Sequence, residues 1–230
     1  GFQHRFMTAA LFGTGLFEGG GQKRSAPDAM RIAAIEAGAV SLILNWCRLE
    51  LSEASIRGPK NNNWSLANGS PKNWSELFAF WYGPNGAHSL HAALTPVVER
   101  LKLPEHPTRA LAAALAKGQP ALLQKTWPQA DADAIRAVMD QASLLLLVDR
   151  IATLDADVAA GGDVAAKAIG ALRGAWIGAL DAVGRADAER GKKLHAAIMR
   201  DKTPPKAADL KVELAVIAPV LGLTAAQIGL

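Results

Sequence analysis

The sequence predicts an all-α protein, a helical bundle built from two pseudo-repeated units, and three observations support this prediction. Alanine and leucine dominate the chain, and β-branched residues seldom alternate with polar ones. Apolar residues recur at spacings of three and four, which is the period of a helix with a packed face. Two short motifs from the first half of the chain return in the second half in the same order.

The spacing of apolar residues predicts helices near residues 3–12, 28–55, 73–82, 86–102, 107–117, 131–160, 163–183, 186–200 and 207–220. The helices at 28–55 and 131–160 become apolar on nearly every side in their second halves. Such a pattern is expected of central helices that are surrounded by neighbours.

Start and stop signals support these assignments. Ser25 is a capping residue with Pro27 in the first turn and Asp28 three residues later, as at the start of a helix. The glycines of "AAGGD" at 159–163 end one helix and let Asp163 begin the next.

An internal repeat is the main signal of organisation. "DAMR" at 28–31 returns as "DAIR" at 133–136, and "LHAAL" at 90–94 returns as "LHAAI" at 194–198. The two offsets differ by a single residue, which favours a duplicated helical unit over chance. The aspartate and arginine of each first motif are best explained as a first-turn acid with an intrahelical partner.

The two copies diverge mainly in one segment. We expect a first helical unit over residues 1–127 and a second over residues 128–230. The first unit carries an Asn-rich loop and then a run of aromatic residues and histidines within 61–94, whereas the second has Trp176 as the single aromatic of the corresponding stretch. This difference makes the 61–91 segment the candidate functional site.

Composition restricts the classes of function. The formal charge is +4, and the basic residues are scattered among acids, so no nucleic-acid partner is expected. Cys47 is the only cysteine, in an apolar run, and is expected to pack as a small buried hydrophobe. The longest apolar runs, 37–44 and 142–148, are too short to cross a bilayer, so no transmembrane segment is expected.

Histidines and acids are the candidate metal ligands. His88 and His91 would share a face if "GAHSLHAAL" were helical throughout, and His195 is the repeat counterpart of His91. Carboxylates from facing helices would complete such a site in a helical bundle. The acids available on the predicted central helices are Glu36, Glu76 and Asp140.

The ordinary alternative is that these side chains are structural. Single histidines are commonly surface or hydrogen-bonded residues. A carboxylate on an apolar face must be paired, protonated or metal-bound, and Arg31 or Arg136 would be the partner of Glu36 or Asp140 in that case.

An aromatic stripe precedes the histidines. Trp74, Phe78 and Trp81 lie at helical spacing, and Tyr82 follows beside the turn "GPNG". Trp81 and Tyr82 are the candidate cofactor- or ligand-binding residues, and the alternative is that the stripe belongs to the core while the phenol bonds to the turn. Buried Trp74 and Trp81 would indicate core, and exposed ones a contact surface for a protein partner.

Two motifs carry a family resemblance. Gly86 and His88 in "GAHSLH" resemble the G-x-H-x-x-E motif of imelysin-like proteins, with His91 in the place of the acid. "WSELFAFWYG" is similar to the W-x-E-x-x-A-F-x-x-G segment of algal iron-assimilation proteins and their bacterial relatives. The resemblance implies a periplasmic or secreted, all-helical protein of two related bundles that is concerned with iron.

The expected function is therefore binding outside the cytoplasm, of a metal ion, iron above all, or of a small ligand. The alternative is a helical scaffold that binds a protein partner through the 61–91 segment. A hydrolase is least favoured because no Ser-His-Asp or Cys-His pattern is visible. The chain begins at "GFQHRFM" without an initiator methionine, which fits a processed mature chain or a recombinant form.

Overall fold

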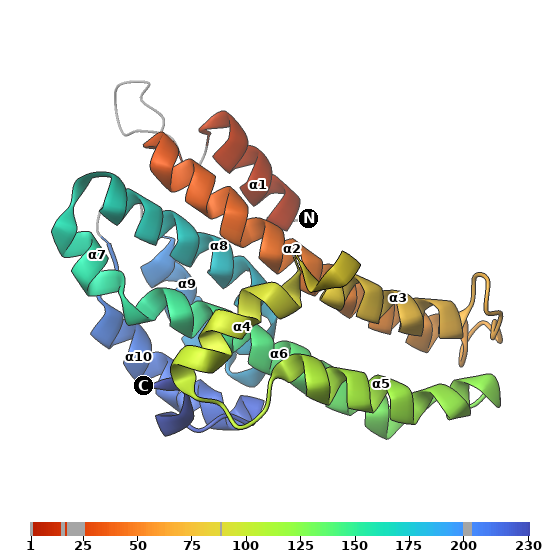
Figure 1. Ribbon diagram of the computed structural model, residues 1–230. Coiled ribbons are helices and arrows are strands. Elements are labelled where there is room, and N and C mark those ends of the chain that lie inside the picture. The colour runs from red at the N-terminus through yellow and green to blue at the C-terminus, as the bar shows by residue number, and fades with distance from the viewer. Residues whose placement is uncertain (1, 15–16, 18–25, 88, 200–203) are drawn as a thin grey trace. The chain divides into compact units, whose positions relative to one another are not determined.

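The computed structural model shows an all-α protein (Figure 1). It describes residues 2–14, 17, 26–87, 89–199 and 204–230, and none of these lies in a strand. The predicted fold class is confirmed in this respect. Ser25, the predicted capping residue, lies outside the described residues.

The α-helices, in chain order, are α1 (Phe2–Phe12), α2 (Asp28–Arg57), α3 (Ser70–Tyr82), α4 (Leu90–Leu101), α5 (Pro107–Leu123), α6 (Gln129–Ala152), α7 (Leu154–Ala160), α8 (Gly162–Ala186), α9 (Ala188–Ile198) and α10 (Ala207–Ile217). Short 3-10 turns occur at η2 (Pro84–Gly86), η3 (Ala218–Leu221) and η4 (Ala226–Ile228).

Three predicted helices differ from the observed ones by more than small shifts of their ends. The helix predicted over 131–160 is broken at Thr153, whose hydroxyl donates a hydrogen bond to Asp157 Oδ2 over 2.6 Å. The helix predicted from residue 86 begins only at Leu90, because the 3-10 turn η2 precedes it. The helix predicted to end at residue 117 runs on to Leu123.

The chain folds into two compact units. One consists of residues 1–42 and 143–230, and the other of residues 43–142. Neither coincides with the 1–127 and 128–230 units that the repeat predicts, because α2 and α6 each belong to both compact units. The division into 1–127 and 128–230 and the duplication of a helical module stay predictions.

Helix α8 packs against the first half of α2 through glycines. A Cβ atom at Gly170 would lie 2.1 Å from the carbonyl oxygen of Met30, and one at Gly174 would lie 2.7 Å from that of Ala34. Ser41 Oγ donates a hydrogen bond of 2.8 Å to the carbonyl of Gly174. The two backbones can approach this closely only because these positions of α8 lack side chains.

The repeated Asp-Arg motif forms intrahelical ion pairs, as predicted. Asp28 and Arg31 are 3.1 Å apart, and Asp133 and Arg136 are paired in the same way. Arg31 also donates hydrogen bonds to the carbonyls of Ala10 and Leu11 at the end of α1. In the first copy the arginine thus caps a neighbouring helix as well.

The unit of residues 43–142 contains a buried ion pair between α2 and α6. Arg48 Nη2 lies 3.1 Å from Asp140 Oδ1, and the two side chains are 12% and 9% exposed. Cys47 on the same stretch of α2 is fully buried, as predicted, and burial raises the pKa of its thiol to about 12. The thiol is therefore protonated at neutral pH.

Helix α2 bears on the membrane prediction. Among the described residues it is a helix long and apolar enough to cross a bilayer by length and composition. The core helix of a soluble protein or a signal sequence can have the same composition. The predicted absence of a transmembrane segment stays a prediction.

The Arg48–Asp140 pair yields a test of stability. Replacing Arg48 by Met should lower the free energy of unfolding by about 3 kcal/mol, because a buried carboxylate loses its guanidinium partner. The matched control is Arg136→Met, which removes the more exposed pair with Asp133 and should change stability by at most about 0.5 kcal/mol. Urea denaturation measures both, and equal losses would contradict the assigned role of Arg48.

Candidate functional site

Helix α3 carries the aromatic stripe. It has Pro71 in its first turn and ends at Gly83, whose φ of 64° lies in the left-handed region that glycine tolerates best. Trp74 and Trp81 are buried, 2% and 0% exposed, while Tyr82 is 36% exposed. By the criterion set from the sequence, the two tryptophans belong to the core and do not form a contact surface.

Trp74 holds α3 against α5. Its indole Nε1 donates a hydrogen bond of 3.0 Å to the carbonyl of Leu115. A Cβ atom at Gly118 would lie 2.6 Å from the Trp74 ring, so that only glycine admits the ring here. Trp127 packs against the same ring in a T-shaped arrangement, with centroids 5.7 Å apart.

Trp81 is linked to a histidine through a threonine. Its Nε1 donates to Thr108 Oγ1 over 2.9 Å, and His91 Nδ1 lies 3.1 Å from the same oxygen. The indole can only donate, so the Thr108 oxygen accepts from Trp81 and bridges it to the imidazole.

A second histidine, His106, caps α5. Its Nδ1 accepts a hydrogen bond of 3.1 Å from the backbone N–H of Thr108, and its Nε2 lies 3.2 Å from Thr95 Oγ1. Thr95 donates in turn to the carbonyl of His91 over 2.8 Å. Both nitrogens of a neutral, Nε2-protonated imidazole are thereby satisfied.

The environment of His106 disfavours its protonated form. Burial lowers the pKa of His106, and the nearby charges of His91 and Arg109 lower it further. Protonation would also replace the acceptor at Nδ1 with a donor that faces a backbone N–H and the positive end of α5.

The rings form a continuous row that begins on α3. Phe78 stacks on Tyr82 with centroids 5.6 Å apart, Tyr82 contacts His91 at 5.1 Å, and His91 contacts His106 at 4.6 Å. A Cβ atom at Gly86 would lie 3.2 Å from the Tyr82 hydroxyl and 3.5 Å from His91 Cδ2. Phenol and imidazole therefore converge at this turn.

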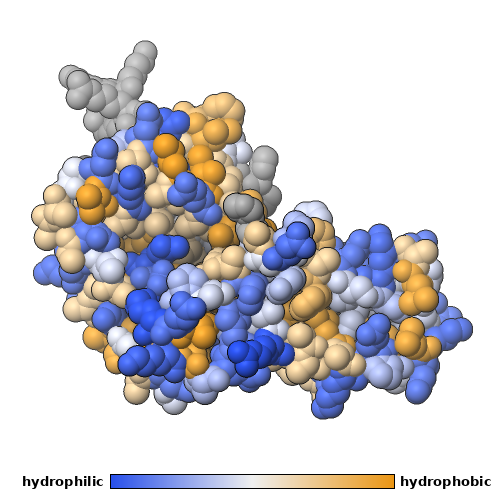
Figure 2. Space-filling view, viewed as in Figure 1, coloured by the Kyte–Doolittle hydropathy of each residue, from blue (hydrophilic) through white to orange (hydrophobic). Residues whose placement is uncertain are grey.

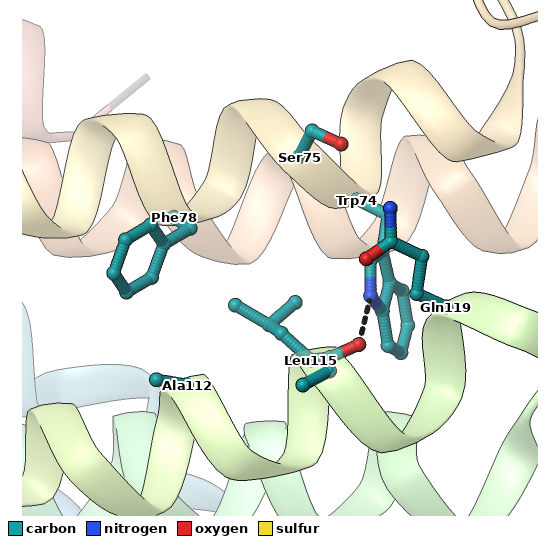
Figure 3. Close-up of a pocket in the computed structure, with 7 residues that line it drawn as sticks. Trp74, Ser75, Phe78, Ala112, Leu115 and Gln119 are labelled. Atoms are coloured by element: carbon teal, nitrogen blue, oxygen red, sulfur yellow. Dashed lines mark hydrogen bonds between the residues drawn. The ribbon is translucent and has the colours of Figure 1, made fainter.

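A groove opens between α3 and α5 beside this row. Figure 3 shows Phe78 and Trp74 projecting from α3 towards α5, where Ala112 leaves space beneath the Phe78 ring. The cavity has a volume of about 270 Å³. The lining residues are Trp74, Ser75, Phe78, Ala112, Leu115, Ala116 and Gln119.

The groove is mainly apolar and has two polar groups. Gln119 is exposed and brings an amide to the end near Trp74 (Figure 3). Ser75 Oγ donates to the carbonyl of Pro71 over 3.0 Å, which leaves its oxygen able to accept. The space-filling view shows apolar residues interspersed with polar ones over the visible surface (Figure 2).

The predicted acids are engaged elsewhere or exposed. Asp140 pairs with Arg48 and not with Arg136, Glu76 forms an i,i+4 pair of 3.2 Å with Lys72, and Glu36 is exposed. Glu36 was expected on a buried face, but its side chain lies outside the buried stripe of α2.

The predicted histidines are not brought together as a metal site by the described residues. His88 lies outside them, and Ser89, the capping residue of α4, is extended, so "GAHSLHAAL" is not helical throughout as the shared face required. His195 accepts a hydrogen bond of 3.0 Å from Trp176 in the other compact unit, and no group of three or more His, Cys, Asp or Glu side chains is found in the described part of the chain. A site joining His91 to His195 stays a prediction.

Sequence reasoning missed His106, Thr108 and Thr95. Pro107 at the start of α5 marks His106 as its capping residue, which is a readable signal. Nothing in the sequence indicates that this cap lies against His91.

No family model, curated protein or solved structure matches the chain.

The capping role of His106 predicts a pH dependence. Because its folded pKa is below the unfolded value, the neutral form stabilises the fold above about pH 6.5, and this contribution is lost as the pH falls through the folded pKa. His106→Asn keeps an acceptor at the cap but does not titrate. Thermal melts at pH 7.5 and 5.5 should therefore show a smaller drop in Tm for His106→Asn than for the wild type, and equal drops would contradict this role.

Proposed function

We propose that this protein is a non-enzymatic binding protein and that the groove between α3 and α5 takes a small ligand. One observation carries this proposal: two aromatic side chains wall an open cavity of about 270 Å³ where α5 presents alanines. Small-ligand sites are typically concave and apolar with a few polar groups, and this cavity lies at the small end of their range.

The chemistry of the walls indicates a flat, neutral ligand. Phe78 and Trp74 offer ring surfaces, and Ala112 offers little bulk opposite them. Gln119 and Ser75 can hydrogen-bond one polar atom of the ligand. A small aromatic ring with a single N–H or O–H group satisfies these features.

The state of Cys47, the only cysteine of the chain, favours a binding role over hydrolysis. Cys47 is buried and its pKa is raised, which disfavours the reactive thiolate. The location outside the cytoplasm rests only on the resemblance of the "GAHSLH" and "WSELFAFWYG" segments to extracytoplasmic proteins.

Pseudo-repetition of the two units is part of the proposal and has one structural support. In each compact unit a fully buried indole is connected by hydrogen bonds to Nδ1 of the histidine in an L-H-A-A motif. Trp81 is connected to His91 through Thr108, and Trp176 donates directly to His195. The offsets of the repeat do not align the two tryptophans, so the equivalence is one of contact and not of position.

Filling the groove tests the ligand site. With indole as the probe, the wild type should bind with a Kd of about 0.1–1 mM, as small ligands of this size do. Ala112→Leu should abolish binding because the new side chain occupies the space under Phe78. Ala113→Leu, on an exposed position outside the groove, is the matched control.

The readout is the side-chain N–H resonance of Trp74 in two-dimensional NMR, since this indole both lines the groove and is hydrogen-bonded to Leu115. Unchanged binding in Ala112→Leu, or equal loss in both variants, would remove the groove as the site.

A metal ion, iron above all, is the second candidate, and the convergence of Tyr82 and His91 at Gly86 favours it. Ferric iron prefers phenolate and carboxylate oxygens and also accepts imidazole. Thr108 holds His91 at Nδ1, as an outer partner holds an imidazole that ligates through its other nitrogen. His88 is three residues away in sequence and would complete the set.

This candidate predicts metal-dependent stabilisation. At a concentration about 100-fold above Kd, ferric, zinc or copper ions should raise Tm by about 5 °C. Tyr82→Phe keeps the ring stacked on Phe78 and removes only the phenol oxygen, and it should abolish the shift produced by iron. Elemental analysis of protein purified without a histidine tag should find metal. A metal-free protein with no Tm shift, and a His88→Ala variant that behaves like the wild type, would contradict it.

A further inference from the structure

We propose that a second groove, between the C-terminal half of α8 and α9, binds a small carboxylate with an apolar tail. The groove lies in the unit formed by residues 1–42 and 143–230, and it goes beyond the ligand site proposed between α3 and α5. Its volume is about 470 Å³. The lining residues are Leu180, Gly184, Ala188, Gly191, Lys192 and His195.

Two glycines create this groove. Helix α9 follows α8 after Asp187, which caps it by accepting from the backbone N–H of Arg190. A Cβ atom at Gly191 would lie 3.3 Å from the Cα of Gly184, so the helices are close at this point. A Cβ atom at Gly184 would meet no atom within 4 Å, so the space beside it is open.

The groove has an apolar floor and a basic edge. Leu180, Ala188 and the two glycines offer no charge. Lys192 and His195 are three residues apart on α9 and therefore lie on the same face. No acid is among the lining residues. The basic edge can therefore attract an anionic group, and the apolar floor can contact a hydrocarbon chain.

Lys192 is available to an anionic ligand. Its ammonium lies 2.7 Å from Glu189 Oε1, and both side chains are largely exposed. Exposed pairs of this kind contribute little to stability, so the ammonium can turn from Glu189 to a carboxylate in the groove at small cost.

His195 is held in one orientation. Trp176, which is fully buried, donates its indole N–H to His195 Nδ1 over 3.0 Å. Since Nδ1 accepts, the proton of the neutral ring is on Nε2. The buried indole therefore holds the imidazole in place at the edge of the groove.

Binding of octanoate tests the proposal, with octan-1-ol and octylammonium as uncharged and cationic probes of similar length. By calorimetry or NMR titration, octanoate should bind the wild type about fivefold or more tightly than octan-1-ol, and octylammonium should bind most weakly. Equal binding of the three probes would overturn the assignment of a carboxylate site.

Two variants place the site. Gly184→Leu should abolish octanoate binding by filling the open space, while Gly184→Ala should bind about as the wild type does; both should keep or raise Tm, because glycine is a poor helix former. Lys192→Gln should weaken octanoate about fivefold and leave octan-1-ol unchanged. Full octanoate binding by Gly184→Leu or Lys192→Gln would overturn the proposal.

The outcome is independent of the other groove. Ala112→Leu, which fills the cavity between α3 and α5, should leave octanoate binding unchanged. Loss of indole binding in that variant together with retained octanoate binding would establish two separate sites. Loss of binding of both ligands would overturn the proposed site between α8 and α9.

Discussion

Three buried indoles determine the arrangement of much of this protein, because the N–H group of each needs an acceptor. Trp74, Trp81 and Trp176 are almost completely buried. Leaving such a group unpaired in the interior costs about 1–3 kcal/mol, so each indole must meet an oxygen or an imidazole nitrogen. The acceptors are a carbonyl of α5, a threonine at the start of α5 and a histidine of α9. Within its own compact unit, each bond therefore fixes a ring and the helix opposite it.

Each of the two candidate grooves lies near one of these buried tryptophans. A large ring is accommodated where the facing helix carries small residues, as at Gly118 opposite Trp74. Further small residues along that helix, Ala112 and Ala116, leave the first groove open. In the other unit Trp176 orients His195, and Gly184 and Gly191 leave the second groove beside it. Both grooves are thus lined in part by small residues of closely packed helices.

The histidines illustrate how one residue type serves different purposes in this chain. His106 is a helix cap whose neutral form is required by the hydrogen bond that it accepts. His91 Nδ1 lies at hydrogen-bond distance from the threonine that accepts from Trp81, and His195 Nδ1 accepts directly from Trp176. In both places the histidine of the L-H-A-A motif is thus connected at Nδ1 to a buried tryptophan, although the two tryptophans are not at equivalent positions of the repeat.

The sequence by itself determined the helical class, the approximate helix positions and the burial of Cys47, because helical periodicity and an apolar setting are local properties. It also identified the stripe of Trp74, Phe78 and Trp81, since three and four residue spacing places side chains on one face whatever the rest of the chain does. These features need no knowledge of distant neighbours.

Only the tertiary structure decided the partners. Asp140 pairs with Arg48 on another helix and not with Arg136 on its own. His106 lies beside His91 although most of α4 and a loop separate them in the chain. The compact units were also beyond local reasoning, because α2 and α6 each contribute to both. Pairings across helices depend on which faces meet and at what register. That is settled by the packing of whole side chains in three dimensions and is not encoded in any short window of sequence.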